Sequence, residues 1–518
     1  MESTKEASTI EEDSAISVAR GATYIFVQDI AQAIIGITAL AFIARLISKT
    51  EIGVYASLML IVSATQIVAT IGLSSAATKF TAELLGKNNR EASAGVAYQI
   101  LTTTFTISIA IAILISIFPR ELAIYLTKDI TYEGLFRLLP IISILAGPML
   151  NISGILLGLQ KIKQLATIRV VWSVARWGIA IPLLVLGFGL YGILYGWITS
   201  EIAFLSLSLI LIAKSLGPPR FKFDLMGSEM CIRDRPLSIN DLVSFANNWF
   251  ERILLLALLP LDALGTYTVV FRAFEILFVI PGAIATALFP KYSQIQGRSG
   301  IKSVEKASYV ASRYLSFITT PLAIGLAATS FPTISLFAGS EYEDGALPLA
   351  LLSLFLAVVS VGAPTGYILL VVEKTATYSG ITIASVLGST IIGILLMPIL
   401  SLAAASLARG AAMLTGLMLT VFILRREMKL KFDNEAIWKS WAASIPMAII
   451  VLSMQYFWYN KFIFPIYVLA GATIYLLMLR VLNAGKPRDF ELMRLYVGER
   501  FAFAADWMEK LLLPNRTN

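Results

Sequence analysis

Two arginines within one long apolar segment are the residues of this sequence best suited to bind a ligand. Arg169 and Arg176 lie seven residues apart, a spacing that places both side chains on the same face of a helix. Two fixed guanidinium groups inside such a segment suit a phosphate or pyrophosphate better than a cationic drug, because each can donate paired hydrogen bonds to an anion. The alternative for Arg169 is that it extends back to the lipid headgroups from near the start of its helix.

Polar side chains also recur on one face of two other apolar segments. The first face carries Gln28, Asp29 and Gln32, and the second carries Asp241, Ser244, Asn248 and Glu251 or Arg252. Ionisable groups are costly inside hydrocarbon and usually face a polar interior. We therefore expect these faces to supply acids that couple a Na⁺ or H⁺ ion, namely Asp29, Asp241 and Glu251. The expected cavity-lining residues are Gln28, Gln32 and Ser244.

Three further side chains complete the expected substrate site: Asn248, Arg252 and Arg272. Two alternatives remain open. Asp241 can instead cap a helix near the membrane interface. Arg272 can pair with Glu275, which lies three residues further along the same helix face.

The elements that must hold these side chains are membrane helices. Of the 518 residues, 57% are hydrophobic and 14% are charged, and the mean hydropathy is +0.79. A soluble domain carries about 25% charged residues. Apolar runs of about 20 residues follow one another with short polar breaks, as bilayer-crossing helices require. We expect an all-α integral membrane protein.

The residue inventory excludes several kinds of chemistry. Histidine is absent and Cys231 is the single cysteine, so we expect no disulfide, no zinc or other metal site and no histidine proton relay. The sequence contains no catalytic triad pattern and no phosphate-cradling glycine motif. These features favour a transporter over an enzyme, without catalytic residues and without a cofactor. The net charge of +8 is explained by cytoplasmic loops, and no nucleic-acid partner is expected.

Fourteen transmembrane helices are expected from the apolar runs. The first six lie at about 21–46, 53–75, 94–118, 135–159, 165–187 and 190–213. The next six lie at about 238–261, 265–289, 308–331, 346–371, 378–399 and 401–424, and two more at about 438–458 and 462–483. Lys and Arg gather in the loops on one side, which predicts a cytoplasmic-membrane protein with both termini in the cytoplasm.

Features of the first half return at an offset of 212 residues. Gly53-Val54-Tyr55 recurs as Gly265-Thr266-Tyr267, and Lys79-Phe80 recurs as Lys291-Tyr292. A constant offset indicates two homologous halves, and six spans in each half make them parallel repeats. The expected parts are a polar cytoplasmic tail (1–19), a first six-helix lobe (20–214), an inter-lobe loop (215–237), a second lobe (238–424), two added helices (425–484) and an amphipathic cytoplasmic tail (485–518).

The inter-lobe loop contains an unusual segment. Residues 229–235 read Glu-Met-Cys-Ile-Arg-Asp-Arg, which resembles the translation of a transposon end used to tag DNA in sequencing libraries. We interpret this segment as a sequencing scar and leave it out of the fold argument, with a chance match as the alternative.

Several short motifs carry a resemblance to a known family. They are Glu51-Ile52-Gly53-Val54-Tyr55, Gly72-Leu73-Ser74-Ser75-Ala76, Leu264-Gly265-Thr266-Tyr267, Phe289-Pro290-Lys291 and Gly339-Ser340-Glu341-Tyr342. Together with the two-halves layout, they make the chain similar to the polysaccharide biosynthesis (O-antigen type) flippases of the multidrug/oligosaccharidyl-lipid/polysaccharide exporter superfamily. The resemblance spans nearly the whole chain.

The resemblance implies a fold and a function. It implies two six-helix lobes around a central cavity that opens alternately to each membrane face. It also implies a substrate on a polyprenyl or dolichyl (pyro)phosphate carrier, with cavity arginines such as Arg169 and Arg176. A monomer in contact with membrane lipids and a lipid-linked glycan is expected. Three alternatives stay open: a multidrug/cation antiporter, a peptidoglycan-precursor flippase and a membrane-embedded glycosyltransferase.

Overall fold

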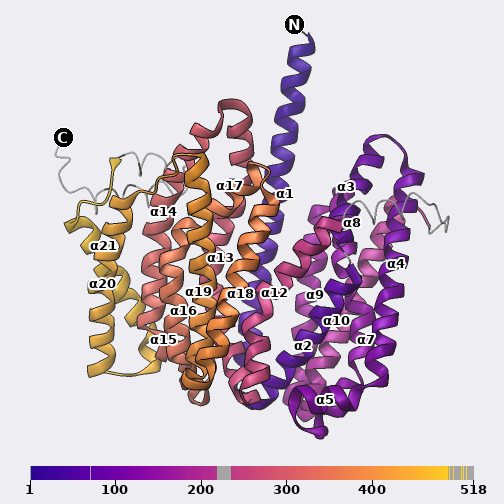
Figure 1. The fold of residues 1–518 in the computed structure, drawn as a ribbon, viewed down its shortest axis with the longest axis horizontal. Helices are drawn as coiled ribbons and strands as arrows, with labels where there is room; N and C mark the ends of the chain where they lie inside the picture. Colours follow the sequence, from indigo (N-terminus) through magenta and orange to yellow (C-terminus); the bar gives the residue numbers. More distant parts are fainter. Residues whose placement is uncertain are drawn as a thin grey trace. The chain divides into compact units, whose positions relative to one another are not determined.

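The computed structural model describes residues 2–70, 72–218 and 235–487, together with Asp489, Arg494, Phe503, Asp506 and Glu509. Within this part of the chain all regular structure is helical, in agreement with the all-α prediction (Figure 1). The interpreted scar lies outside the described residues except for its last residue, Arg235. The expected tail 485–518 lies mostly outside them.

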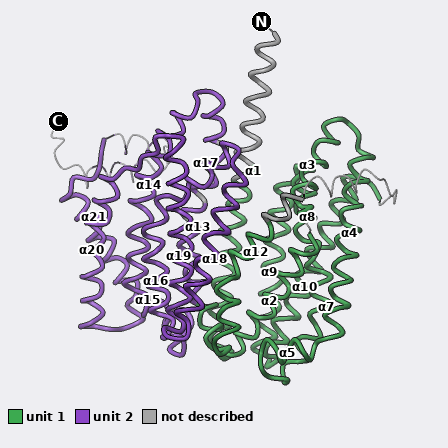
Figure 2. Tube along the Cα trace, viewed as in Figure 1, with its two compact units in different colours: residues 1–269 green, residues 270–518 purple. Residues whose placement is uncertain are grey.

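The chain divides into two compact units, residues 1–269 and 270–518 (Figure 2). The helices of unit 1 are α1 (Glu2–Ile43), α2 (Lys49–Thr70), α3 (Leu73–Gly86), α4 (Arg90–Ile117), α5 (Pro119–Thr127), η1 (Ile130–Tyr132), α6 (Glu133–Phe136), α7 (Leu139–Ala146), α8 (Met149–Gly158), α9 (Ile162–Leu183), η2 (Leu184–Phe188), α10 (Gly189–Leu216) and α12 (Arg235–Leu258). Helix α13 (Leu261–Ser299) begins in unit 1 and continues into unit 2.

Unit 2 continues with both short and long helices. They are α14 (Ile301–Ala328), α15 (Ser330–Phe337), η3 (Ser340–Gly345), α16 (Ala346–Val359), η4 (Ser360–Gly362), α17 (Thr365–Val371), α18 (Thr375–Leu400), α19 (Leu402–Glu427), α20 (Asn434–Phe457), η5 (Lys461–Ile463) and α21 (Phe464–Val481). Helix α14 packs against α16 and α20, and α19 packs against α16 and α18.

Among the described residues, 11 helices are long and apolar enough to cross a membrane, or up to 12 if the bent pair Leu261–Val279 and Ile284–Ser299 forms one span. One of the 11, Ile162–Leu216, contains both α9 and α10, which pack along each other. The chain reverses between them at Gly187 (φ 89°) and Gly189 (φ 53°), a backbone region that favours glycine. The expected spans 165–187 and 190–213 therefore both lie in this stretch.

Proline interrupts two spans that the sequence pattern predicts as continuous. The expected span 135–159 is divided into α6, α7 and α8, and Pro148 stands at the start of α8. The expected span 346–371 is divided into α16, η4 and α17, and Pro364 stands at the start of α17. Proline has no backbone N–H to continue the helical hydrogen bonds, so an apolar run can hold more than one helix.

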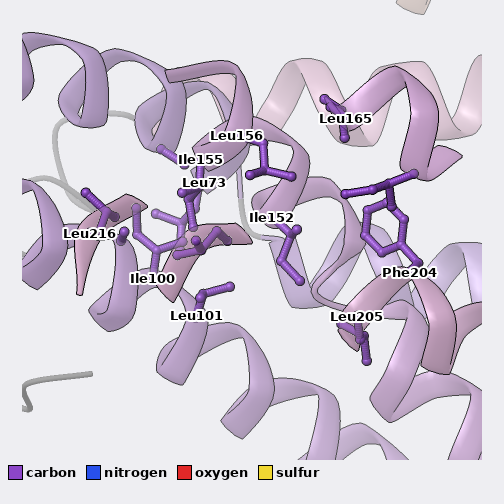
Figure 3. Packing of buried hydrophobic residues seen from close by; sticks show 14 of the residues in the cluster. Leu73, Ile100, Leu101, Ile152, Ile155, Leu156, Leu165, Phe204, Leu205 and Leu216 are labelled. Atoms are coloured by element: carbon purple, nitrogen blue, oxygen red, sulfur yellow. The ribbon is translucent and has the colours of Figure 1, made fainter. Parts of the chain in front are cut away.

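A shared apolar core packs α9, the helix that carries the two arginines, against its neighbours in unit 1. Figure 3 shows its central side chains, which come from α3, α4, α8, α9 and α10. Ile152 and Ile155 of α8 and Phe204 of α10 are fully buried in this cluster. Helix α9 contributes Leu165 and Ile168 to the same core, and Arg169 and Arg176, four and eleven residues after Leu165, lie on the same side of the helix.

Two glycines at the repeat offset lie at a close crossing within unit 1. A β-carbon at Gly53 would collide with the carbonyl oxygen of Leu261, and a β-carbon at Gly265 would collide with that of Lys49. Lys49 and Leu261 differ by 212, as do Gly53 and Gly265. The two contacts are thus related by the same offset as the sequence repeat, and each requires a residue without a side chain.

Candidate functional site

The polar face of α1 meets α9 through a chain of hydrogen bonds. The side-chain amide of Gln28, which is buried, donates to Asp29 Oδ1 at 2.9 Å and to Gln32 Oε1 at 3.2 Å. Gln32 Nε2 in turn donates to the backbone carbonyl of Arg169 at 3.1 Å. Three of the predicted site residues are therefore joined to the start of α9.

The guanidinium of Arg169 is directed at α8. Its Nη2 donates to Ser153 Oγ at 3.1 Å, and its Nε is a buried atom without a hydrogen-bond partner among the described residues. Asp29 of α1 is close enough to act on this cation electrostatically, but the two do not form an ion pair within 4.0 Å. A cation turned toward α8 argues against the alternative in which Arg169 extends to the headgroups.

Arg176 is enclosed by aromatic side chains, and we call this group the Arg176 cage. Its Nη2 donates to Tyr55 Oη of α2 at 2.8 Å, and the side chain is 6% exposed. Its guanidinium carbon lies 4.2, 5.2 and 5.4 Å from the ring centroids of Trp197, Trp177 and Trp172, respectively. Contacts of this kind stabilise a desolvated cation. The Nε atom of Arg176 is buried without a hydrogen-bond partner in the described part of the chain.

A buried acid that sequence reasoning missed lies beside this cage. Glu201 of α10 is 1% exposed, and its Oε1 accepts hydrogen bonds from Trp172 Nε1 at 3.2 Å and Trp197 Nε1 at 3.1 Å. An ionisable residue in the middle of an apolar span is itself a signal of function, and Glu201 lies well inside the expected span 190–213. What the sequence did not reveal is that Trp172 of the neighbouring helix α9 joins Trp197, one turn before Glu201 on α10, as its second donor.

The predicted residues of α12 lie in unit 1 with varied burial. Asp241 and Arg252 are partly buried, and Glu251 is fully buried. The remaining two, Ser244 and Asn248, are exposed.

Arg252, like Arg176, lies beside an indole ring, but among the described residues it has one such neighbour instead of three. Its guanidinium carbon lies 4.9 Å from the ring centroid of Trp249 on the same helix. An aromatic ring thus lies beside Arg252 of α12, as indole rings do beside Arg176 of α9.

Arg272 has a carboxylate partner, as the alternative for it predicts. Its Nη1 lies 2.7 Å from Glu275 Oε2, and each of the two side chains is 39% exposed. An exposed pair of this kind contributes little to stability, about 0–1 kcal/mol. The pair reduces the positive charge that Arg272 presents to an anion.

A different buried arginine forms an ionic cluster in unit 2, which we call the Arg313 clamp. Arg313 of α14 pairs with Asp489 at 2.7 Å and with Asp433 at 3.3 Å, and its Nη2 also donates to the backbone carbonyl of Ala484 at 2.9 Å. Asp433 caps α20 by accepting from the Ala436 N–H at 3.0 Å. The clamp holds α14, the start of α20 and the segment after α21 together.

Among the described residues there is no group of three His, Cys, Asp or Glu side chains that could hold a metal ion. The polar groups gathered in unit 1 are cations, amides, indoles and single carboxylates. An arrangement of this kind can bind an anion and exchange a proton.

Comparison with known families gives one match. A family model described as polysaccharide biosynthesis protein matches residues 42–347, more than half of the chain. No curated relative matches the chain at the sequence level.

Solved structures share the fold. The lipid II flippase MurJ in an inward closed conformation aligns with a TM-score of 0.72 at 18% identity, covering 88% of this chain and 98% of MurJ. An inward-facing multidrug resistance MATE transporter of the MOP superfamily aligns with a TM-score of 0.61 at 17% identity, covering 76% of this chain and 94% of that one. A MOP superfamily transporter from Pyrococcus furiosus, described as having a binding pocket of reverse polarity, aligns with a TM-score of 0.55 at 15% identity and coverages of 79% and 95%.

Proposed function

Because the chain belongs to the polysaccharide biosynthesis protein family and has the fold of MOP superfamily membrane transporters, we propose that it is a flippase for a lipid-linked oligosaccharide. The family resemblance seen in the sequence is confirmed, and the chain is a transporter and not an enzyme. The proposed substrate is an oligosaccharide on a polyprenyl or dolichyl (pyro)phosphate, moved across the cytoplasmic membrane by alternating access.

One observation carries this proposal: two guanidinium groups on one face of α9 each keep a buried Nε–H without a partner. Neither Arg169 nor Arg176 forms an ion pair with a described carboxylate, although both lie inside a candidate membrane span. A buried N–H donor without an acceptor is destabilising. A (pyro)phosphate group would supply the missing acceptors and also neutralise the charge.

These residues suit the transport of a glycan headgroup across a membrane. A glycan headgroup cannot cross about 30 Å of hydrocarbon without a polar environment that replaces its water. The amides of Gln28 and Gln32 and the hydroxyl of Ser153 are suited to sugar and phosphate oxygens, while a lipid tail can remain in the bilayer. The sequence carries no nucleotide-binding motif, so we propose an ion gradient or membrane potential as the energy source.

The finer architecture belongs to the same proposal. It comprises fourteen spans, two parallel six-helix lobes around a central cavity, two added helices, a monomeric state and cytoplasmic termini. In this architecture, substrate binding involves Asn248, Arg252 and Arg272. The acids that couple a Na⁺ or H⁺ ion are Asp29, Asp241 and Glu251. The 212-residue relation between the Gly53 and Gly265 contacts supports the parallel repeat.

A second candidate is a flippase for the peptidoglycan precursor. The alignment with the lipid II flippase MurJ covers 88% of this chain, which favours it. Both candidates share a polyprenyl diphosphate group and differ in the sugar. The residues that bind the (pyro)phosphate would therefore be the same in both.

Complementation distinguishes the two candidates. The chain is expressed in one strain that lacks its O-antigen flippase and in another that lacks its peptidoglycan-precursor flippase. We expect the wild-type chain to restore surface polysaccharide in the first strain, and Arg176→Ala to fail at equal membrane abundance. Rescue of the second strain alone would assign the peptidoglycan precursor. Rescue of neither strain, with the protein correctly inserted in both, would contradict the flippase proposal.

A further inference from the structure

Glu201 is a buried carboxyl group with one oxygen bound and the other free. Its Oε1 accepts both indole N–H groups, from Trp172 and Trp197, whereas its Oε2 is buried without a hydrogen-bond partner among the described residues. A purely structural acceptor for two indoles needs no charge, and a glutamine or a serine would serve. A carboxylate with a vacant buried oxygen has room for a proton on that oxygen.

Arg176 is the cation next to Glu201. Both groups contact the same indole: the guanidinium stacks 4.2 Å from the centre of the Trp197 ring, and the carboxylate accepts from its N–H. Arg176 acts electrostatically on Glu201 without forming a direct ion pair in the described structure. The guanidinium of Arg176 and the carboxyl group of Glu201 thus share one indole ring.

Helix α9, which packs against α10, also carries Arg169, but of the two arginines only Arg176 acts electrostatically on Glu201. Helices α7 and α8, which pack against α10, contain no ionisable side chain. The ionisable groups of α4 lie toward the far end of α10, where Arg90 binds the Ser215 carbonyl and Tyr98 binds the Gly217 carbonyl. At the other end, Gly134 of α6 lies against Tyr191, which places Glu133 near the start of α10. The remaining neighbour is Tyr55 of α2, which reaches the site through Arg176.

We propose that Glu201 is a proton-binding site that takes up one proton when an anionic phosphate ligand engages Arg176. This inference rests on the proposed function, because it requires a phosphate at Arg176. The two guanidinium groups of Arg169 and Arg176 balance the roughly two negative charges of a phosphate monoester and leave none for a carboxylate beside them in a low-dielectric interior, so the carboxylate becomes neutral. The proton comes from water and forms an O–H bond at Oε2. It returns to water when the ligand leaves, which couples translocation of the lipid-linked phosphate to proton movement.

The experiment measures proton uptake on ligand binding. The full-length chain is purified in detergent, and farnesyl phosphate is titrated by calorimetry at one pH in two buffers that differ in ionisation enthalpy. The difference between the two buffers gives the protons taken up per ligand bound. We expect wild-type protein to take up about one proton more per ligand than Glu201→Gln, which resembles the protonated acid and should therefore bind farnesyl phosphate about tenfold more tightly than wild type. Any proton exchanged by the ligand itself is common to both proteins and cancels.

A matched control is the variant Glu121→Gln, which changes an exposed acid in the first turn of α5 and should take up protons as wild type does.

Infrared difference spectroscopy of the wild-type protein is a second measurement, and it does not require any variant to fold. Ligand binding should create the carbonyl band of a protonated carboxylic acid.

The outcomes separate the two proposals. If wild type and Glu201→Gln bind the ligand with equal proton uptake, or if wild type shows no new carboxylic acid band, the proton inference is wrong and the flippase proposal stands. If wild-type protein does not bind farnesyl phosphate, the phosphate-binding role of Arg176 is contradicted, and this inference falls with it.

Discussion

Arg176 of α9 and Arg313 of α14 are buried to the same extent, with 6% of each residue exposed, but their neighbours differ. Arg313 has two carboxylates and a backbone carbonyl as partners. Arg176 has a phenol and three indole faces, and its Nε–H is left without an acceptor. A guanidinium whose charge and donors are satisfied holds helices together. One whose charge is only partly offset can still bind an anion. Burial alone therefore does not identify a functional arginine, whereas the satisfaction of its donors does.

The largest effect is expected from breaking the Arg313 clamp. Arg313→Ala leaves Asp433, which is 1% exposed, without its cation, and removing one partner of a buried ion pair costs about 3–5 kcal/mol. In a chain of this size such a loss lowers the melting temperature by on the order of 10 °C. Thermal unfolding of the purified protein in detergent measures it.

The matched control for the clamp is Arg137→Ala. Arg137 pairs with Glu133 at 2.8 Å, but its side chain is 68% exposed, so its loss should cost no more than about 1 kcal/mol. Equal melting temperatures for Arg313→Ala and Arg137→Ala would show that the clamp is not structural.

The next largest effect is expected for ligand binding at Arg176. Arg176→Ala should insert and fold, because Glu201 can become neutral by protonation. Its affinity for farnesyl phosphate should fall by about 10- to 150-fold, the loss of a hydrogen bond to a charged group worth about 1.5–3 kcal/mol. Arg176→Lys should recover only part, because an ammonium group cannot make the two-pronged contact. Calorimetric titration measures all three proteins.

A double variant tests whether Arg176 serves only as the counter-charge of Glu201. Arg176→Ala combined with Glu201→Gln removes both charges. If the double variant binds farnesyl phosphate as wild type does, Arg176 neutralises the acid and does not contact the ligand. We expect the affinity to remain as low as in Arg176→Ala.

A smaller effect is expected at Arg169. Its guanidinium keeps one hydrogen bond, to Ser153, and lies near Asp29, so part of its charge is already offset. Arg169→Ala should weaken farnesyl phosphate binding by about tenfold, at the low end of the range for a charged hydrogen bond. Ser153→Ala, which leaves the cation in place, should change the affinity by less than about threefold. An equal loss in both variants would mean that the hydroxyl contributes as much as the cation.

Much of this organisation could be predicted from the sequence. Helical structure and the resemblance to the family follow from composition, apolar runs and short motifs, and both are confirmed. The chain of Gln28, Asp29 and Gln32 follows from helical periodicity, since residues three and four apart share a face.

Other features depend on contacts between distant segments. Nothing in the sequence near Arg176 indicates that it would contact Tyr55 and Trp197, which belong to two other helices. Tyr55 and Trp197 are themselves more than a hundred residues apart in the chain. For Arg313, the sequence does not reveal Asp433 and Asp489 as partners. A local pattern can thus place an arginine inside the membrane, but only the packing decides whether its donors are satisfied. That distinction separates the cage from the clamp.

The smallest effect is expected from removing a single member of the cage. Trp172→Phe keeps an aromatic ring near Arg176, whose guanidinium carbon lies 5.4 Å from the Trp172 centroid, and removes one of the two indole N–H donors to Glu201. Because Trp197 still donates to Oε1, the loss should be close to one ordinary hydrogen bond, about 1 kcal/mol. Melting temperature should fall by only about 2–4 °C, and farnesyl phosphate affinity should stay within about threefold of wild type. A loss of stability as large as that of Arg313→Ala would mean that the cage is as rigidly structural as the clamp, and the contrast between the two buried arginines would disappear.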